Sequence, residues 1–261
     1  MPAPRHLRHA PITEAIFDFR VKARPEFRPE EFTSLKTQLS DRFPKVDEYR
    51  GLQATFGMIQ GRGQPPVVQD LGFQGYFFKT SDDKTIAQFR VDGFTFNRLH
   101  PYTSWKELFP QSMDLWRLYS SISTPEVITR LAVRYINRIT LPTGAITFET
   151  YLRAVPVIPS ELPQYISSFL TRVTIYDPET DIAAHVTQAL EPNTQEQRLI
   201  VILDIDAYKQ SEFAIDDPMI EQTFQQLRAF KNLIFLNSLT EETLGQFEGR
   251  IYMLGEGWAC I

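Results

Sequence analysis

The sequence predicts an α+β protein of two tandem units, each with the order strand, helix, three or four antiparallel strands, helix. Segments that alternate apolar and polar residues are interspersed with segments that repeat apolar residues every three or four positions, the periods of a half-buried strand and an amphipathic helix. Asp92-Gly93, between two alternating segments, is typical of a β-hairpin turn. Because the same order of elements recurs in the second half, we expect the units to span residues 1–123 and 124–261.

The first unit opens with an alternating segment, Glu14–Lys22, in which Phe17 and Phe19 share one face. A helical period follows over Pro29–Phe43, and Pro44 prevents its continuation. Strands are then expected at Tyr49–Gln60, Val67–Thr80, Lys84–Val91 and Phe94–Leu99.

The helix that closes the first unit has a clear predicted start. Ser104 and Glu107 have the spacing of a capping box. Pro110 is expected to kink or shorten the helix. An apolar stripe then indicates one buried face and consists of Trp105, Leu108, Phe109, Trp116 and Tyr119.

The second unit repeats this order, beginning with a strand at Leu131–Leu141 and a short helical segment at Phe148–Arg153. Asp217-Pro218 is expected to start a helix that runs through Leu236, before a last short helix at Thr240–Phe247. The strands between them are expected at Phe169–Tyr176, Ile182–Leu190 and Leu199–Asp206.

Two such units predict two curved antiparallel sheets with helices on one side, arranged like a saddle or face to face. The order resembles the saddle-shaped fold of the TATA-binding protein in topology alone. A shared topology implies no function.

Composition favours a cytoplasmic protein. The single cysteine, Cys260, has no partner for a disulfide, which is typical of a reducing compartment. No apolar run approaches the roughly 20 residues that cross a bilayer, and the N-terminus lacks the apolar core of a secretory signal. We therefore expect no membrane association.

Charge is distributed unevenly along the chain. Residues 1–120 carry 17 Lys and Arg against 14 Asp and Glu, whereas residues 121–261 carry 10 against 18. An acidic second half repels phosphate backbones, so nucleic-acid binding is disfavoured unless it is confined to the first half.

Two stretches carry a family resemblance: Ala10-Pro11-Ile12-Thr13-Glu14-Ala15-Ile16-Phe17-Asp18-Phe19-Arg20-Val21 and Arg130-Leu131-Ala132-Val133-Arg134-Tyr135-Ile136-Asn137-Arg138-Ile139. With a generic amphipathic segment near Leu233–Phe247, they resemble an uncharacterised, sporadically distributed bacterial protein family of about this length. The resemblance implies no agreed activity. Patchy distribution implies mobile or defence-related genes.

The candidate binding residues lie on the predicted strands and are Glu14, Arg20, Arg134, Arg138, Phe94 and Phe96. Arg20, Arg134 and Arg138 would form one basic row if the first strands of the two units were adjacent, and arginine binds carboxylate or phosphate through two parallel hydrogen bonds. The competing interpretation pairs these arginines with Glu14, Asp18 or other carboxylates on a solvated face.

Two further candidates have simpler structural interpretations. Asp204 and Asp206 project from one strand face, as carboxylates that hold a divalent metal can, but they could equally lie at a solvated strand end. Phe94 and Phe96, near arginines, could stack on the bases of a single-stranded nucleic acid, although the same pair could face the helices.

The sequence contains no phosphate-binding loop, dinucleotide-binding fingerprint or Gly-x-Ser-x-Gly nucleophile motif, and we predict no cofactor. The leading hypothesis is a non-enzymatic binding or regulatory protein that acts through a protein partner, such as the antitoxin-like or accessory member of a bacterial defence or toxin–antitoxin pair. The alternative is a nucleotide- or nucleic-acid-binding enzyme or sensor that uses the strand arginines and the Asp-x-Asp pair. A homodimer joined through an exposed sheet edge is a third possibility.

Overall fold

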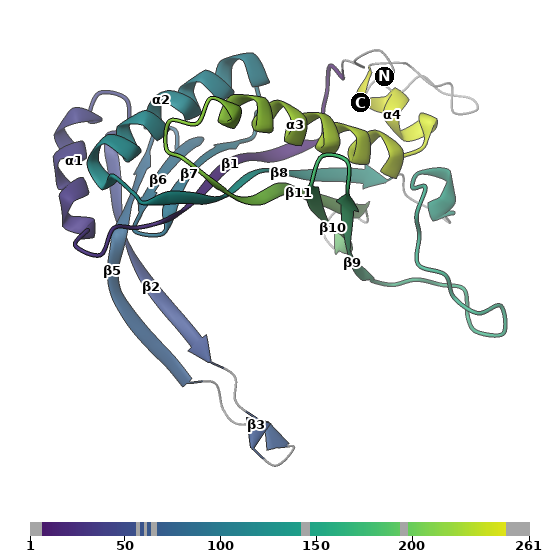
Figure 1. The fold of residues 1–261 in the computed structure, drawn as a ribbon. Coiled ribbons are helices and arrows are strands. Elements are labelled where there is room, and N and C mark those ends of the chain that lie inside the picture. The colour runs from purple at the N-terminus through teal and green to yellow at the C-terminus, as the bar shows by residue number, and fades with distance from the viewer. Residues whose placement is uncertain are drawn as a thin grey trace.

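A computed structural model describes residues 7–55, 58–59, 62–63, 67–141, 147–193 and 198–248. The main sheet has nine antiparallel strands in the order β2-β5-β6-β7-β1-β8-β11-β10-β9 (Figure 1). Its strands are β1 (Ile12–Lys22), β2 (Lys45–Thr55), β5 (Val67–Lys79), β6 (Thr85–Arg90), β7 (Gly93–Leu99), β8 (Val127–Leu141), β9 (Leu170–Asp177), β10 (Ile182–Asn193) and β11 (Arg198–Phe213). The remaining elements are α1 (Leu35–Gln38), α2 (Trp105–Ser123), α3 (Met219–Ser238), α4 (Glu241–Phe247), the 3₁₀ helices Pro29–Ser34 and Phe148–Thr150, and the small pair β3 (Met58–Ile59) and β4 (Arg62–Gly63).

The α+β class is confirmed, but the prediction of two tandem units is wrong, because the strands form one continuous sheet. Strand β1 pairs with β7 on one side and with β8 on the other. In the second pairing Phe17 lies opposite Val133, and Phe19 lies opposite Leu131. The strands that were expected to open two separate units therefore form the centre of a single sheet. The expected boundary falls in the turn between α2 and β8.

Helices α2 and α3 cover one face of this sheet, and the core lies between them (Figure 1). Phe19 stacks on Trp116 of α2 with 4.3 Å between ring centroids, and its ring lies 4.9 Å from that of Phe224 on α3. The ring of Phe17 lies 5.1 Å from that of Trp105 on α2, in a tilted arrangement. The alternate residues of β1 therefore face away from the helices, on what we call the open face.

The predicted helix over Pro29–Phe43 is shorter in the structure. A 3₁₀ helix spans Pro29–Ser34, and only Leu35–Gln38 is α-helical. The apolar positions that suggested a helix are nevertheless buried, and they are Phe32, Leu35, Leu39 and Phe43. The spacing therefore identified the buried side chains correctly, although the segment coils more tightly than predicted.

The hairpin predicted at Asp92-Gly93 is confirmed between β6 and β7. Gly93 has φ of +152°, and a Cβ at this position would lie 2.1 Å from the carbonyl oxygen of Phe19. Glycine is needed here because β1 and β7 approach too closely for a side chain.

Helix α2 begins where the capping residues predicted, and it continues through Pro110 to Ser123. The Ser104 hydroxyl accepts a hydrogen bond from the Glu107 amide at 3.3 Å. We expect Ser104→Ala to lower the free energy of unfolding by about 1 kcal/mol, because this amide loses its partner. Urea denaturation measures the change. Ser121→Ala, within the same helix, is the matched control and should be nearly neutral.

Candidate functional site

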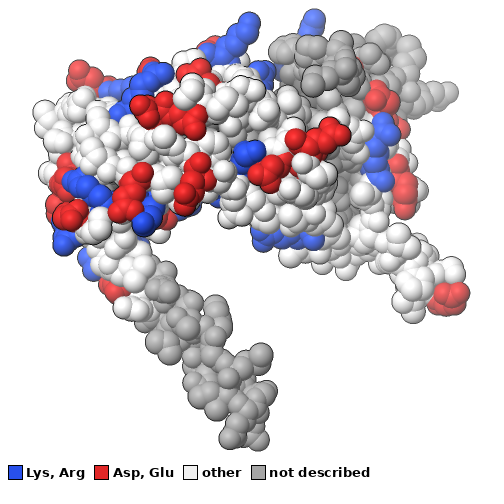
Figure 2. Space-filling view, viewed as in Figure 1, with Lys and Arg blue, Asp and Glu red and all other residues white. Residues whose placement is uncertain are grey.

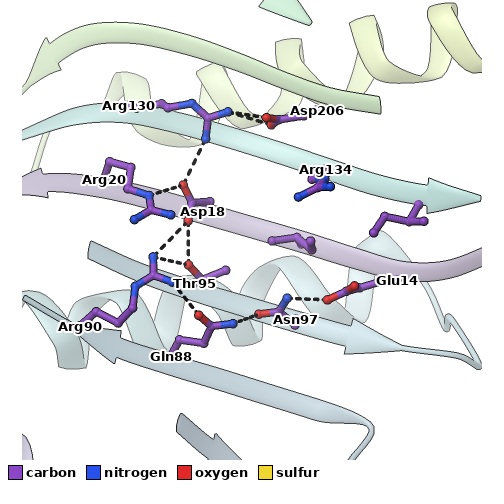
Figure 3. Close-up of a pocket in the computed structure, with 12 residues that line it drawn as sticks. Glu14, Asp18, Arg20, Gln88, Arg90, Thr95, Asn97, Arg130, Arg134 and Asp206 are labelled. Atoms are coloured by element: carbon purple, nitrogen blue, oxygen red, sulfur yellow. Dashed lines mark hydrogen bonds and ion pairs between the residues drawn. The ribbon is translucent and has the colours of Figure 1, made fainter. Parts of the chain in front are cut away.

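The open face of the sheet carries a hollow of about 360 Å³ lined by charged and amide side chains. These side chains project from β1, β6, β7, β8 and β11, on the face of the sheet opposite the helices (Figure 3). The lining consists of Glu14, Ile16, Asp18, Arg20, Gln88, Arg90, Thr95, Asn97, Arg130, Arg134, Ile136 and Asp206.

Asp18 lies at the centre of this group and is only 8% exposed. Its Oδ1 accepts a hydrogen bond from the Thr95 hydroxyl at 2.7 Å, and its Oδ2 accepts from Arg130 at 3.2 Å and from Arg20 at 3.1 Å. Arg90 lies 3.7 Å from the same carboxylate. One buried anion is thus compensated by three arginines from three strands, as a charge removed from water requires.

Two further aspartates, both on β11, pair with arginines of β8. Arg130 donates from one nitrogen to both oxygens of Asp206, each at 2.8 Å. Arg134 forms a two-bond pair with Asp204 at 2.9 and 2.6 Å. The hydrogen bonds that Arg134 donates to Asp204 raise the pKa of the Arg134 guanidinium, which therefore remains charged.

A chain of amides links Arg90 to Glu14 (Figure 3). Arg90 donates to the Gln88 carbonyl oxygen at 2.6 Å, Gln88 donates to Asn97 at 3.0 Å, and Asn97 donates to Glu14 at 2.6 Å. Because arginine only donates and a carboxylate only accepts, the ends fix the orientation of both amides. We call this chain, together with Asp18, Arg20, Thr95, Arg130, Asp206 and the adjacent pair Arg134–Asp204, the open-face network.

The structure brings three of the predicted binding residues together, because Glu14, Arg20 and Arg134 all line the hollow. They do not form the basic row considered above. Arg20 contacts Asp18 and Asp92, and Arg134 contacts Asp204. Arg138 lies farther along β8, opposite Ile202 of β11, and is exposed.

The other two predicted pairs have different surroundings. Phe94 and Phe96 have no exposed surface and contact other rings of the core, so they present no stacking surface for a base. Asp204 and Asp206 share a face as predicted, but their carboxylates contact arginines. Among the described residues, no cluster of three or more His, Cys, Asp and Glu is arranged to hold a metal ion.

Sequence reasoning missed the central role of Asp18 and did not select Gln88, Thr95 or Asn97. The alternation of apolar and polar residues along the strands did indicate that these side chains lie on the open face. Each of them is adjacent on its strand to a buried phenylalanine or alanine. The pattern identifies the open face. It does not identify which polar residues contact each other across strands.

A second buried polar group lies on the helix side of the sheet, at Lys231 of α3. The Lys231 ammonium lies 3.7 Å from the centroid of the Tyr135 ring, and the Tyr135 hydroxyl lies 3.3 Å from that of Tyr102. Burial, together with the neighbouring Arg228, lowers the pKa of Lys231 to about 7. Burial also raises the pKa of Tyr135. This amine is thus poised between its charged and neutral forms near neutral pH.

No protein-family model, curated protein or solved structure matches this chain. Within the described ranges, none of the helices has the length and apolar character that crossing a membrane would require.

Proposed function

We propose that this chain is a non-enzymatic binding or regulatory protein and that its open face receives a protein partner. The observation that carries the proposal is the open-face network, an ordered set of paired charges on the sheet face that the helices leave uncovered. The β2–β5 hairpin and residues 153–169 project on either side of this face (Figure 1). Such pre-organised polar groups reduce the cost of ordering side chains when a partner binds.

The balance of charge favours a protein over a polyanion. Four arginines line the hollow (Arg20, Arg90, Arg130 and Arg134), and five carboxylates line it or pair with them (Glu14, Asp18, Asp92, Asp204 and Asp206). A phosphate backbone would have to displace carboxylates of its own sign. On the side of the molecule shown in Figure 2, acidic and basic side chains are likewise interspersed. A surface of mixed charge suits a protein surface that also carries both signs.

The pair Arg134–Asp204 offers a sharp test, because Arg134 is the most exposed of the paired arginines in the hollow, with 45% of its side chain accessible. Removing both members leaves no uncompensated charge, so the fold should be retained. We expect the tagged wild-type chain to capture one near-stoichiometric protein from its native cell, and Arg134→Ala with Asp204→Ala to reduce this recovery at least tenfold. Quantitative mass spectrometry measures the recovery.

The matched control is Asp114→Ala with Arg117→Ala, an exposed pair on α2 that is 2.8 Å apart, away from the open face. This variant should recover as much partner as wild type. Equal recovery by the Arg134/Asp204 variant, or nucleic acid or nucleotide in place of a protein, would contradict the proposal. An antitoxin-like or accessory role in a defence pair would use the same face, and the identity of the captured protein would test it.

A further inference from the structure

Strand β9 is one edge of the sheet, and it is unusually apolar for an edge. It pairs with β10 on one side and with no other described strand. Leu170, Val173 and Tyr176 each have more than half of their surface exposed, at 74%, 55% and 58%. An edge strand of this kind is a template for pairing with another chain.

The opposite edge of the same sheet differs in composition. The first six residues of β2 include four charged side chains, Lys45, Asp47, Glu48 and Arg50. Charged side chains of this kind discourage pairing between edges. The eight residues of β9 include only Arg172 and Asp177 as charged side chains. One edge is therefore protected by charge, and the other is not.

The helix side of β9 also lines an uncovered apolar groove of about 620 Å³. Val173 and Ile175 of β9 form one wall, and Phe230 and Leu233 of α3 form the other. Leu233 is itself 52% exposed. Two surfaces of β9 thus remain available to a partner. The backbone groups along its outer edge pair with no other described strand, and its apolar residues on the helix side are accessible.

We propose that β9 pairs with β9 of a second copy of this chain, antiparallel about a two-fold axis through Thr174. This register places Val173 of one copy opposite Ile175 of the other, so both apolar walls continue across the interface. Thr174 lies opposite Thr174. Residues that lie directly opposite each other on paired strands project from the same face of the sheet. This register therefore pairs apolar side chains with apolar side chains on the helix side.

Charge complementarity supports a second copy of the chain as the partner of β9. In the same register Arg172 lies opposite Tyr176, whose hydroxyl donates to Asp181 at 3.1 Å. Arg172 of each copy thus approaches the Tyr176–Asp181 pair of the other, twice by symmetry. An isologous interface requires this self-complementarity. The two-fold axis is perpendicular to the sheet, so both open faces point to the same side of the dimer.

The oligomeric state of the full chain tests whether β9 forms a dimer interface. We expect light scattering after size exclusion to give the mass of a dimer for wild type, and that of a folded monomer for Val173→Glu with Ile175→Glu. Val157→Glu is the matched control, because Val157 is 94% exposed and lies outside β9; it should remain dimeric. A monomeric wild type at about 100 μM, or a dimeric Val173/Ile175 variant, would overturn the proposal.

A cysteine test examines the register, with Cys260→Ser removing the native thiol. Across the axis, two residues at position 174 have Cα atoms about 4.5–5.5 Å apart, within disulfide range. Two residues at position 172 are about 13 Å apart along the strands. Mild oxidation should therefore cross-link Thr174→Cys and leave Arg172→Cys uncross-linked. Equal cross-linking of the two variants, or none at position 174, would exclude this register.

Discussion

Replacing Asp18 by alanine is expected to lower the free energy of unfolding by about 3–5 kcal/mol. The carboxylate is buried and accepts hydrogen bonds from Arg20, Arg130 and Thr95, with Arg90 beside it. Its removal leaves several cations close together on the open face without the anion that compensates them. Urea denaturation at neutral pH, followed by circular dichroism, measures the change.

Asp114→Ala is the matched control for Asp18→Ala. Asp114 also pairs with an arginine, Arg117, but both side chains are more than half exposed. Exposed pairs contribute little, so the expected loss is below about 1 kcal/mol. If the two alanine variants were equally stable, the open-face network would not be the ordered, buried group that the structure describes.

The second large effect concerns Lys231 and has the opposite sign. Lys231→Met is expected to raise the free energy of unfolding by about 1–4 kcal/mol at pH 6, because an apolar side chain of similar volume replaces a buried charge. The Lys231 side chain is 8% exposed and its ammonium contacts the ring of Tyr135. Lys36→Met, at an exposed lysine that also lies over a tyrosine ring, is the control and should change stability by less than about 0.5 kcal/mol.

The gain from Lys231→Met should decrease as the pH rises. Burial lowers the pKa of Lys231 in the folded chain to about 7, from the ordinary value of 10.5. Below pH 7 the amine is protonated in both the folded and unfolded states, and the full cost of the buried charge is present. Between pH 7 and 10.5 the folded chain releases this proton while the unfolded chain keeps it, so wild type gains stability relative to the variant. Urea denaturation from pH 6 to 10 should show the two chains converging, and a constant difference would contradict a buried, neutralised amine.

Local structure was largely predictable because it depends on neighbouring residues. The alternation around Phe17 and Phe19 located β1, Asp92-Gly93 located a hairpin, and Ser104 located the start of α2. Each of these signals lies within a few residues of the element that it specifies, and this is the range over which turn and capping chemistry acts.

The arrangement of the strands was not predictable in the same way. The pairing of β1 with β8 joins residues more than a hundred positions apart, and nothing in either strand alone distinguishes a shared sheet from two separate ones. The same limit applies to the site. Asp18 and Arg130 were each visible as polar residues on a strand, but their contact depends on the register of that pairing.

The central position of β1 has a consequence for the chain while it is being synthesised. Strand β1 is made before its neighbour β8, which begins at Val127, roughly a hundred residues later. At a synthesis rate of about 5–20 residues per second, β8 is made about 5–20 s after β1, and the edge of β1 that pairs with β8 is unpaired during this time. Charged residues within a strand discourage pairing with other chains, and Asp18 and Arg20 flank Phe19 on β1. We therefore expect the charges that order the open face of the finished protein also to keep nascent chains from associating with one another.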